Sequence, residues 1–175
     1  MAENQAPTSP GTREGTEVER ESGQLQLVTF HVGDEQFAVD ILAVQEINRL
    51  TQITQAPESP PGVLGVINLR GRIVPVIDLR QRFGMEITEA TSASRIIVVD
   101  ICDRTIGFMV DRVDEVLRID KSVVDPAPVD VTGGKRQYIA GIGKLDDRLV
   151  ILLDVSKLLD QESLASVDET LAKAA

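Results

Sequence analysis

The pattern of apolar and polar positions predicts a chain built mostly from short β-strands. Apolar residues alternate with polar ones over residues 24–32, and a shorter run follows the turn Gly33-Asp34-Glu35, as in a β-hairpin. Later runs rich in Val and Ile repeat this arrangement. The strands expected after the first hairpin are residues 63–69, 73–77, 95–101 and 105–110, with an extended segment at 111–119.

The segment 62–84 predicts a strand, a tight turn, a second strand and a short helix. The turn is Arg70-Gly71, where Gly takes positive φ at low steric cost. Pro75 has no backbone N–H, so we expect an edge position or a bulge there. Asp78, with Gln81 three residues later, has the capping-box spacing that begins a helix.

Other helix signals are short. Residues 40–49 predict a helical turn that leads into a strand. Near the end of the chain, Leu164, Val167 and Leu171 recur at helical spacing within residues 160–173. We therefore expect a weakly amphipathic C-terminal helix.

The chain contains an internal repeat. Residues 141–159 align without a gap with residues 65–83, and the block 106–116 more weakly matches 37–47. Because the two matches occur in the same order, they indicate a duplicated unit of about five strands. The predicted fold class is all-β (mainly β), with two pseudo-repeated five-stranded small β-barrel subdomains that share a hydrophobic core.

Composition limits the possible functions. The chain has 175 residues, 42% of them hydrophobic, and a net charge of −10, which makes nucleic acid a poor partner. Cys102 is the single cysteine, and we expect a buried, inert thiol because apolar residues surround it. No signal peptide and no membrane span of about 20 apolar residues is evident. These features predict a cytoplasmic protein whose residues 1–23 are disordered.

The candidates for catalysis have simpler explanations. His31 is the only histidine and has no partner for metal binding or nucleophilic catalysis in its motif. Asp78 and Asp154 occupy equivalent repeat positions, and both precede short helical stretches, so capping explains them. The glycines do not form a phosphate-binding loop. We therefore expect no enzyme activity, no cofactor and no metal.

The arginines suggest a binding surface instead. Arg70 and Arg72 flank the hairpin turn, and Arg80 and Arg82 follow closely, which predicts a basic patch on an acidic protein. The equivalent turn in the second repeat is Asp146-Asp147. Opposite charges on two related lobes suit a protein that binds two partners or joins end to end.

The repeated segments resemble the CheW family, the bacterial chemotaxis coupling proteins. Residues 65–80 are similar to the family signature, residues 37–47 to its upstream motif, and residues 107–117 and 147–154 to its second-half motifs. The resemblance covers about residues 24–160. It implies two intertwined barrel subdomains at 24–160, preceded by the tail 1–23 and followed by a C-terminal helix or tail at 161–175.

The resemblance also implies a function. It identifies a non-enzymatic scaffold that couples methyl-accepting chemoreceptors to the histidine kinase CheA in arrays at the membrane. The receptor's helical signalling tip would dock in a groove between subdomains. The regulatory domain of CheA would contact one subdomain, and further CheW copies would join in rings.

Site residues follow by motif position. Those that the resemblance assigns to receptor binding are Val44, Glu46, Gly65 and Arg70. Val44 would supply apolar contact beside charged groups. A weaker assignment places kinase binding at Gly143, Leu145 and Arg148.

Three alternatives remain open at this point. A CheW-like adaptor could serve a non-flagellar array that controls twitching motility or development. A detached regulatory domain of the kinase would have the same fold, although the chain carries no phosphotransfer helix or ATP-binding motif. A small enzyme is disfavoured because no nucleophile, base and ligand set is evident.

Overall fold

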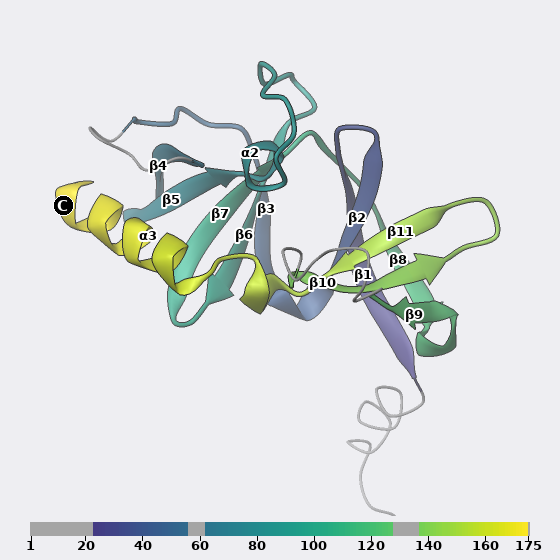
Figure 1. Ribbon diagram of the computed structural model, residues 1–175. Coiled ribbons are helices and arrows are strands. Elements are labelled where there is room, and N and C mark those ends of the chain that lie inside the picture. The colour runs from purple at the N-terminus through teal and green to yellow at the C-terminus, as the bar shows by residue number, and fades with distance from the viewer. Residues whose placement is uncertain (1–22, 56–61, 128–136, 175) are drawn as a thin grey trace, which may run out of the picture.

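The structure is a computed structural model that describes residues 23–55, 62–127 and 137–174. Two β-sheets lie side by side, and the C-terminal helix runs along the outside of one of them (Figure 1). The sheet that carries this helix has the order β3 (Val44–Arg49), β6 (Arg95–Ile101), β7 (Arg104–Val110), β5 (Arg72–Asp78) and β4 (Val63–Leu69). We call it the five-stranded subdomain. The tail predicted at 1–23 lies, except for Gly23, outside the described residues.

The other sheet forms the six-stranded subdomain. Its order is β8 (Arg112–Asp120), β1 (Gln24–Val32), β2 (Glu35–Asp40), β11 (Leu149–Leu153), β10 (Ile139–Lys144) and β9 (Val124–Pro126). Helical elements are short apart from the last one. They are η1 (Ile41–Ala43), α2 (Leu79–Arg82), η2 (Lys121–Val123), η3 (Val155–Lys157) and α3 (Gln161–Ala174).

The two sequence repeats exchange hairpins. The hairpin β1–β2 of the first repeat pairs with strands of the second, and β6–β7 of the second pairs with strands of the first. The joins are equivalent, because β2 runs parallel to β11 and β7 runs parallel to β5. The predicted fold class is confirmed, but each subdomain takes strands from both repeats rather than closing one repeat on itself. The three-residue η1 carries the chain directly from one sheet into the other.

In each sheet, a single bent segment of the chain pairs with strands at both edges. In the five-stranded subdomain, the chain after β3 reaches the opposite edge, where Thr54 N–H donates to Val66 O at 2.9 Å and Val66 N–H donates to Thr54 O at 2.8 Å. In the six-stranded subdomain, β8 continues through η2 into β9, which pairs with β10 at the far edge. Each sheet is thereby rolled into a small barrel.

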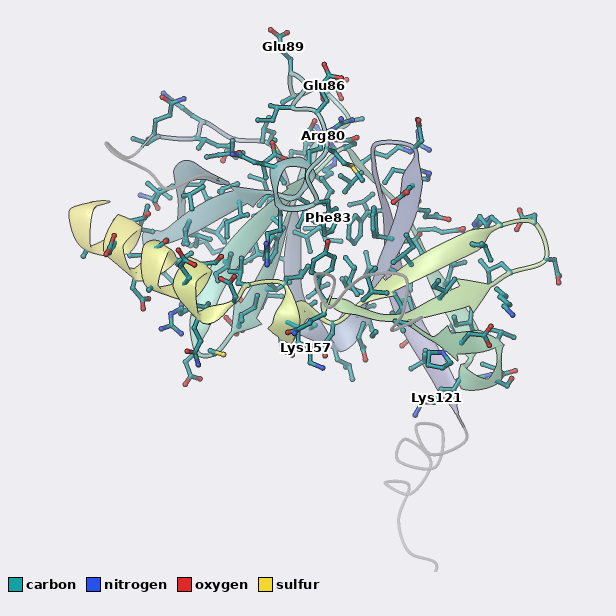
Figure 2. All side chains as sticks on the ribbon, in the orientation of Figure 1. Arg80, Phe83, Glu86, Glu89, Lys121 and Lys157 are labelled. Carbon is teal, nitrogen blue, oxygen red and sulfur yellow. The ribbon has the colours of Figure 1, made fainter. Side chains whose placement is uncertain are left out.

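A shared core joins the subdomains. Its main cluster combines buried residues of both sheets, such as Val28 of β1 and Ile97 of β6. A stack of aromatic rings crosses the junction, with centroid separations of 6.0 Å for Phe30–Phe37, 4.8 Å for Phe37–Phe83 and 5.2 Å for Phe83–Tyr138. Phe83 lies between the two sheets in Figure 2. Such pairs add roughly 0.5–1.5 kcal/mol each beyond their burial.

The predicted helices and caps are confirmed. Asp78 accepts a hydrogen bond from the N–H of Arg80 at 2.9 Å, and Asp154 accepts one from the N–H of Ser156 at 3.0 Å. The C-terminal helix α3 buries Val167 completely and packs Leu164 and Leu171 against the main core. The helical spacing of these three residues therefore correctly predicts the face of α3 that packs against the core.

Two local predictions are wrong. Cys102 is exposed, because it begins the two-residue turn between β6 and β7, where it and Asp103 both have positive φ. Pro75 lies in β5, an inner strand. Its missing N–H is tolerated because Val66, the residue opposite, directs its own N–H and C=O to Thr54 instead.

Candidate functional site

Two of the four receptor-binding candidates meet in an ion pair. Glu46 lies on β3 at one edge of its sheet, and Arg70 lies in the β4–β5 turn at the other. Nη1 of Arg70 is 3.2 Å from Oε2 of Glu46, and Asn48 donates to Oε1 of the same carboxylate at 2.7 Å. The Arg70 side chain is 81% exposed and that of Glu46 is 20% exposed, so the arginine projects into solvent while the carboxylate it pairs with is largely buried.

The turn itself is held by local geometry. Arg70 and Gly71 both have positive φ, as the central residues of a type I′ turn do. Gly71 N–H donates to Oδ1 of Asn68 at 2.9 Å. These contacts fix the backbone from which the Arg70 side chain projects.

Val44, the candidate for apolar contact with the receptor, is the first residue of β3. It is half-buried and packs against the main core, next to a bulge in the pairing of β3 with β6. Ile47, on the same strand, is 38% exposed and supplies the apolar surface there. Sequence reasoning missed Ile47, although the alternation along β3 places it one residue after Glu46 and facing outward.

Gly65 has a structural role. Its φ is +151°, and a Cβ built on it would lie 2.2 Å from the carbonyl oxygen of Thr54. Gly141, its equivalent in the second repeat, lies similarly close to Asp125 of β9, at 2.7 Å. Both glycines allow the bent segment to cross its neighbouring strand, so Gly65 acts on the shape of the subdomain.

The kinase-binding candidates gather at the β10–β11 hairpin. Arg148 donates to Oε1 of Glu115 at 3.0 Å and to Asp147 at 3.2 Å. Leu145 closes the turn, since its N–H donates to Arg148 O at 2.9 Å, and its side chain packs on a small apolar cluster. Gly143 has room for a side chain, because its nearest atoms are 3.6 Å from an added Cβ.

The predicted basic patch is limited to the hairpin tip. Arg72 donates to the hydroxyl of Thr105 at 3.0 Å. Arg80 and Arg82 turn away toward the junction between subdomains. The expectation of four clustered arginines is therefore wrong, because each side chain finds a different partner.

Arg80 and Arg82 instead hold two places where the chain crosses between subdomains. Arg80 forms two hydrogen bonds to Asp111, at 2.8 Å from Nε and 2.5 Å from Nη2, and Asp111 joins β7 to β8. Its Nη1 also donates to Glu86 O at 3.0 Å (Figure 2). Arg82 donates to Leu158 O at 2.7 Å, just before α3.

The electrostatics of this junction follow from burial and pairing. Burial raises the pKa of Asp78, although the N–H and the charge of Arg80 act against it. Burial also raises the pKa of Asp111, but the hydrogen bonds from Arg80 and from Gly33 N–H outweigh that effect and leave the pKa lowered. The ion pair is thus formed at neutral pH, while Asp78 is a carboxyl kept from water.

His31 has a structural partner. Its Nδ1 lies 2.5 Å from Oδ2 of Asp114, which also accepts from Gln36 at 3.0 Å. The ring is partly exposed, as the sequence reading of a half-buried strand residue predicts. Among the described residues, no group of three His, Cys, Asp or Glu side chains is placed to hold a metal ion.

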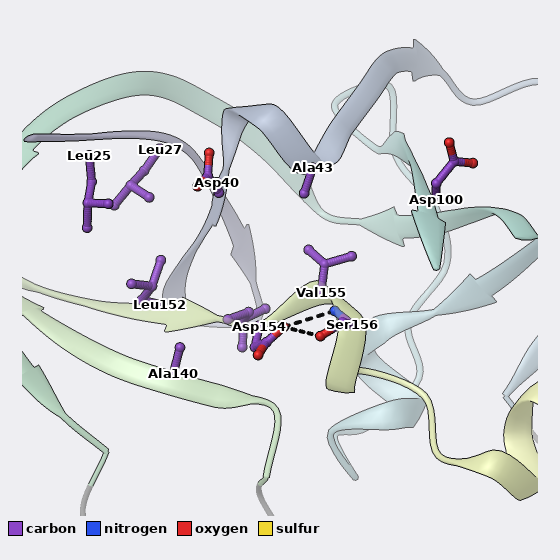
Figure 3. Close-up of a pocket in the computed structure, with 11 residues that line it drawn as sticks. Leu25, Leu27, Asp40, Ala43, Asp100, Ala140, Leu152, Asp154, Val155 and Ser156 are labelled. Carbon is purple, nitrogen blue, oxygen red and sulfur yellow. Dashed lines mark hydrogen bonds between the residues drawn. The ribbon is translucent and has the colours of Figure 1, made fainter. Parts of the chain in front are cut away.

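A groove of about 360 Å³ lies between the subdomains (Figure 3). It takes residues from β1, the β2–η1 link, the β6 strand and the β10–β11–η3 segment. Its lining is Leu25, Leu27, Asp40, Ala43, Asp100, Ala140, Leu152, Leu153, Asp154, Val155 and Ser156. Ala43 is followed directly by Val44, the first residue of β3, so one lining residue adjoins the strand that carries Glu46.

The comparisons with known proteins agree with one another. Residues 26–163 match the family described as the CheW-like domain. Chemotaxis protein CheW of Klebsiella aerogenes is 38% identical over 143 residues, covering 82% of this chain and 86% of that protein. Chemotaxis protein CheW of Helicobacter pylori is 37% identical over 162 residues, covering 93% and 95%. The crystal structure of the scaffolding protein TtCheW from Thermoanaerobacter tengcongensis superimposes with a TM-score of 0.73 at 37% identity, covering 79% of this chain and 94% of that one. This chain belongs to the CheW family.

Proposed function

We propose that this chain, a chemotaxis scaffold of the CheW family, couples the signalling tips of methyl-accepting chemoreceptors to the regulatory domain of the histidine kinase CheA, without catalysing a reaction itself. The observation that carries the proposal is the pairing of Arg70 with Glu46, which lies on β3 three residues after Ala43 of the groove between the subdomains. The pair supplies an exposed charge on the segment that leads away from a groove lined by both subdomains.

The receptor tip is assigned to this groove and to the adjoining surface of β3. A helical hairpin needs apolar contact flanked by charges. The groove offers leucine side chains, Ile47 is 38% exposed on β3, and Arg70 supplies the charge. Gly65 and Val44 contribute by maintaining the shape of this region. Thr54 crosses directly over Gly65, and Val44 packs against the main core.

The kinase is assigned to the six-stranded subdomain. The β10–β11 hairpin exposes Leu149, at 62%, beside the Arg148–Glu115 pair. The turn of this hairpin is Asp146-Asp147, whereas the equivalent turn of the β4–β5 hairpin is Arg70-Gly71. These opposite charges also suit contacts between further CheW copies in rings.

The relatives favour a chemotaxis array over the alternative array for twitching motility or development, because those compared above are named as chemotaxis proteins. In the part of the chain that the structure describes, no helix is long and apolar enough to cross a membrane. The proposed association with membrane arrays therefore runs through the receptors.

A pull-down with the CheA regulatory domain and a receptor signalling-tip fragment tests the assignment. Wild type should retain both partners. Arg70→Glu should lose the receptor and keep the kinase, and Arg148→Glu should do the reverse. Arg118→Glu, an exposed change on β8, serves as the charge control. Failure of the wild type to bind either partner at roughly tens of micromolar would contradict the proposal.

A further inference from the structure

The two subdomains carry the same kind of ion pair but expose opposite members of it. In the pair of Glu46 with Arg70, the glutamate side chain is 20% exposed and the arginine side chain is 81% exposed. In the pair of Glu115 with Arg148, the glutamate is 53% exposed and the arginine is 35% exposed. Because the four residues occupy equivalent positions of the two repeats, the difference comes from the residues around them.

An asparagine orients the acid of the first pair. Asn48 follows Glu46 by two residues on β3, so the two side chains project from the same face of the strand. Nδ2 of Asn48 donates to Oε1 of Glu46 at 2.7 Å, which leaves Oε2 to accept from Nη1 of Arg70 at 3.2 Å. Two residues after Glu115 the second repeat carries Leu117, whose side chain has no hydrogen-bond donor. Glu46 is therefore held by a contact that Leu117 cannot make with Glu115.

A second asparagine fixes the turn that carries the arginine. Oδ1 of Asn68 accepts from Gly71 N–H at 2.9 Å, and this bond spans Arg70 in a turn where Arg70 and Gly71 both have positive φ. In the second repeat Lys144 takes the position of Asn68 and pairs with Asp125 instead. The first repeat thus supplies a separate asparagine contact for each end of its ion pair.

These two contacts lower the cost of using Arg70 as a binding group. A long charged side chain loses rotamer entropy when a partner fixes it. If the carboxylate and the turn are already ordered, part of that entropy is lost on folding rather than on binding. The guanidinium group of Arg70 stays available, because its side chain is 81% exposed.

We propose that Asn48 and Asn68 are positioning residues that preorganise Arg70 for the receptor tip. The proposal rests on the proposed function, which assigns this surface to the receptor. Asn48 acts through the carboxylate of Glu46, and Asn68 acts through the backbone of the turn. Neither asparagine needs to contact the receptor itself.

Replacement of each asparagine tests the proposal. Asn48→Leu installs the residue of the second repeat, Asn48→Asp keeps the shape of the side chain without an N–H donor, and Asn68→Ala removes the acceptor of the turn. Gln161→Leu, an exposed change at the start of α3, is the control. Calorimetric titration measures the affinity of each full chain for a receptor signalling-tip fragment and for the regulatory domain of CheA.

We expect each asparagine variant to bind the receptor fragment about threefold to tenfold more weakly than wild type, as the loss of one preordered side chain allows. Affinity for the CheA domain should not change, and Gln161→Leu should behave as wild type. In an Arg70→Ala background, Asn48→Leu and Asn68→Ala should have no further effect on receptor affinity, because the group they position is absent.

Three results would overturn the proposal. Equal receptor affinity of the asparagine variants and wild type would show that the contacts do not assist binding. A loss that persists in the Arg70→Ala background would mean that the asparagines contact the receptor directly. A parallel loss of CheA binding would indicate general damage to the fold. In each case the proposed function stands if wild type binds both partners.

A failure of wild type to bind the receptor would instead count against the proposed function. The positioning role is then decided by the heteronuclear NOE of the Arg70 Nε–Hε group, which reports the order of this side chain without any partner. We expect a higher value in wild type and Gln161→Leu than in Asn48→Leu and Asn68→Ala. Equal values in all four proteins would overturn the inference.

Discussion

Nη1 of Arg70 lies 3.2 Å from Oε2 of Glu46, and the same kind of pair recurs in the other subdomain, where Nη2 of Arg148 lies 3.0 Å from Oε1 of Glu115. Glu46 and Glu115 occupy equivalent positions in the two sequence repeats. Each subdomain therefore presents a glutamate on its bent strand and an arginine on its hairpin. The duplicated unit gives one molecule two related surfaces, which suits a scaffold with two kinds of partner.

The first prediction separates binding from stability at Arg70. Arg70→Glu should lower the free energy of unfolding by less than about 1 kcal/mol, because an exposed ion pair contributes roughly that much at most. Receptor binding should weaken by about tenfold or more, because an attractive charge becomes repulsive. Chemical denaturation and calorimetric titration with the receptor fragment give the two numbers. An unfolding loss as large as the binding loss would mean that Arg70 supports the fold rather than the interface.

The second prediction concerns Gly65. Gly65→Ala should destabilise the domain by about 1–3 kcal/mol or more, because the new methyl group has no room beside the carbonyl of Thr54. Gly143→Ala is the matched control in the equivalent hairpin, where the nearest atoms are 3.6 Å away, and it should change stability by less than about 0.5 kcal/mol. Thermal unfolding of both variants measures the difference. Equal stability of the two would contradict the crossing of Thr54 over Gly65.

Local sequence patterns predicted the secondary-structure elements of this chain better than they predicted which strands pair with one another. The hairpins, the caps at Asp78 and Asp154 and the buried face of α3 follow from alternation, spacing and side-chain chemistry within a few residues. The exchange of hairpins between repeats depends on which distant strands pair, and nothing in a single strand's sequence encodes that choice. The burial of Cys102 was predicted from its apolar neighbours in the sequence. In the structure Cys102 lies in the two-residue turn between β6 and β7, where its side chain is exposed.

The candidate site was predictable to the same extent. The resemblance located Glu46 and Arg70, and the structure brings these two residues together. It did not predict that Gly65 acts through the crossing of Thr54, because that contact joins residues on different segments. The roles of Arg80 and Arg82 at the junction were also missed, since their proximity in sequence to Arg70 and Arg72 suggested one basic patch.

The third prediction tests the junction between subdomains. Arg80→Ala should lower the free energy of unfolding by about 1.5–3 kcal/mol, because it removes two charge-assisted hydrogen bonds to a partly buried carboxylate. Arg112→Ala is the control, since Arg112 pairs with Asp114 while 57% exposed and should cost less than about 1 kcal/mol. A double-mutant cycle with Asp111→Asn isolates the pair. Additive effects of the two changes would show that Arg80 and Asp111 are not coupled.

The fourth prediction concerns pH. The pKa of Asp78 is raised in the folded protein, so the folded state binds this proton more tightly and the contribution of Asp78 to stability falls as pH rises above about 3.9. The stability of Asp78→Asn relative to wild type should therefore increase between about pH 4 and pH 7.

Asp111 should behave in the opposite way. Because its pKa is lowered, its stabilisation is fully present above the unfolded value of about 3.9 and is lost as pH falls through the folded value. The deficit of Asp111→Asn should thus be largest at neutral pH and shrink below about pH 4. Denaturant unfolding of both variants across this range checks the signs. Parallel profiles for the two variants would contradict the different surroundings of these carboxylates.

The most direct test of the central claim is the autophosphorylation rate of CheA in the presence of receptor-containing membranes, measured with and without this protein. We expect the rate to rise only when receptor, kinase and this chain are all present, and we expect Arg70→Glu and Arg148→Glu each to abolish the rise although both remain folded. A rate that is the same with and without the chain, under conditions where it binds both partners, would contradict its role as the coupling scaffold.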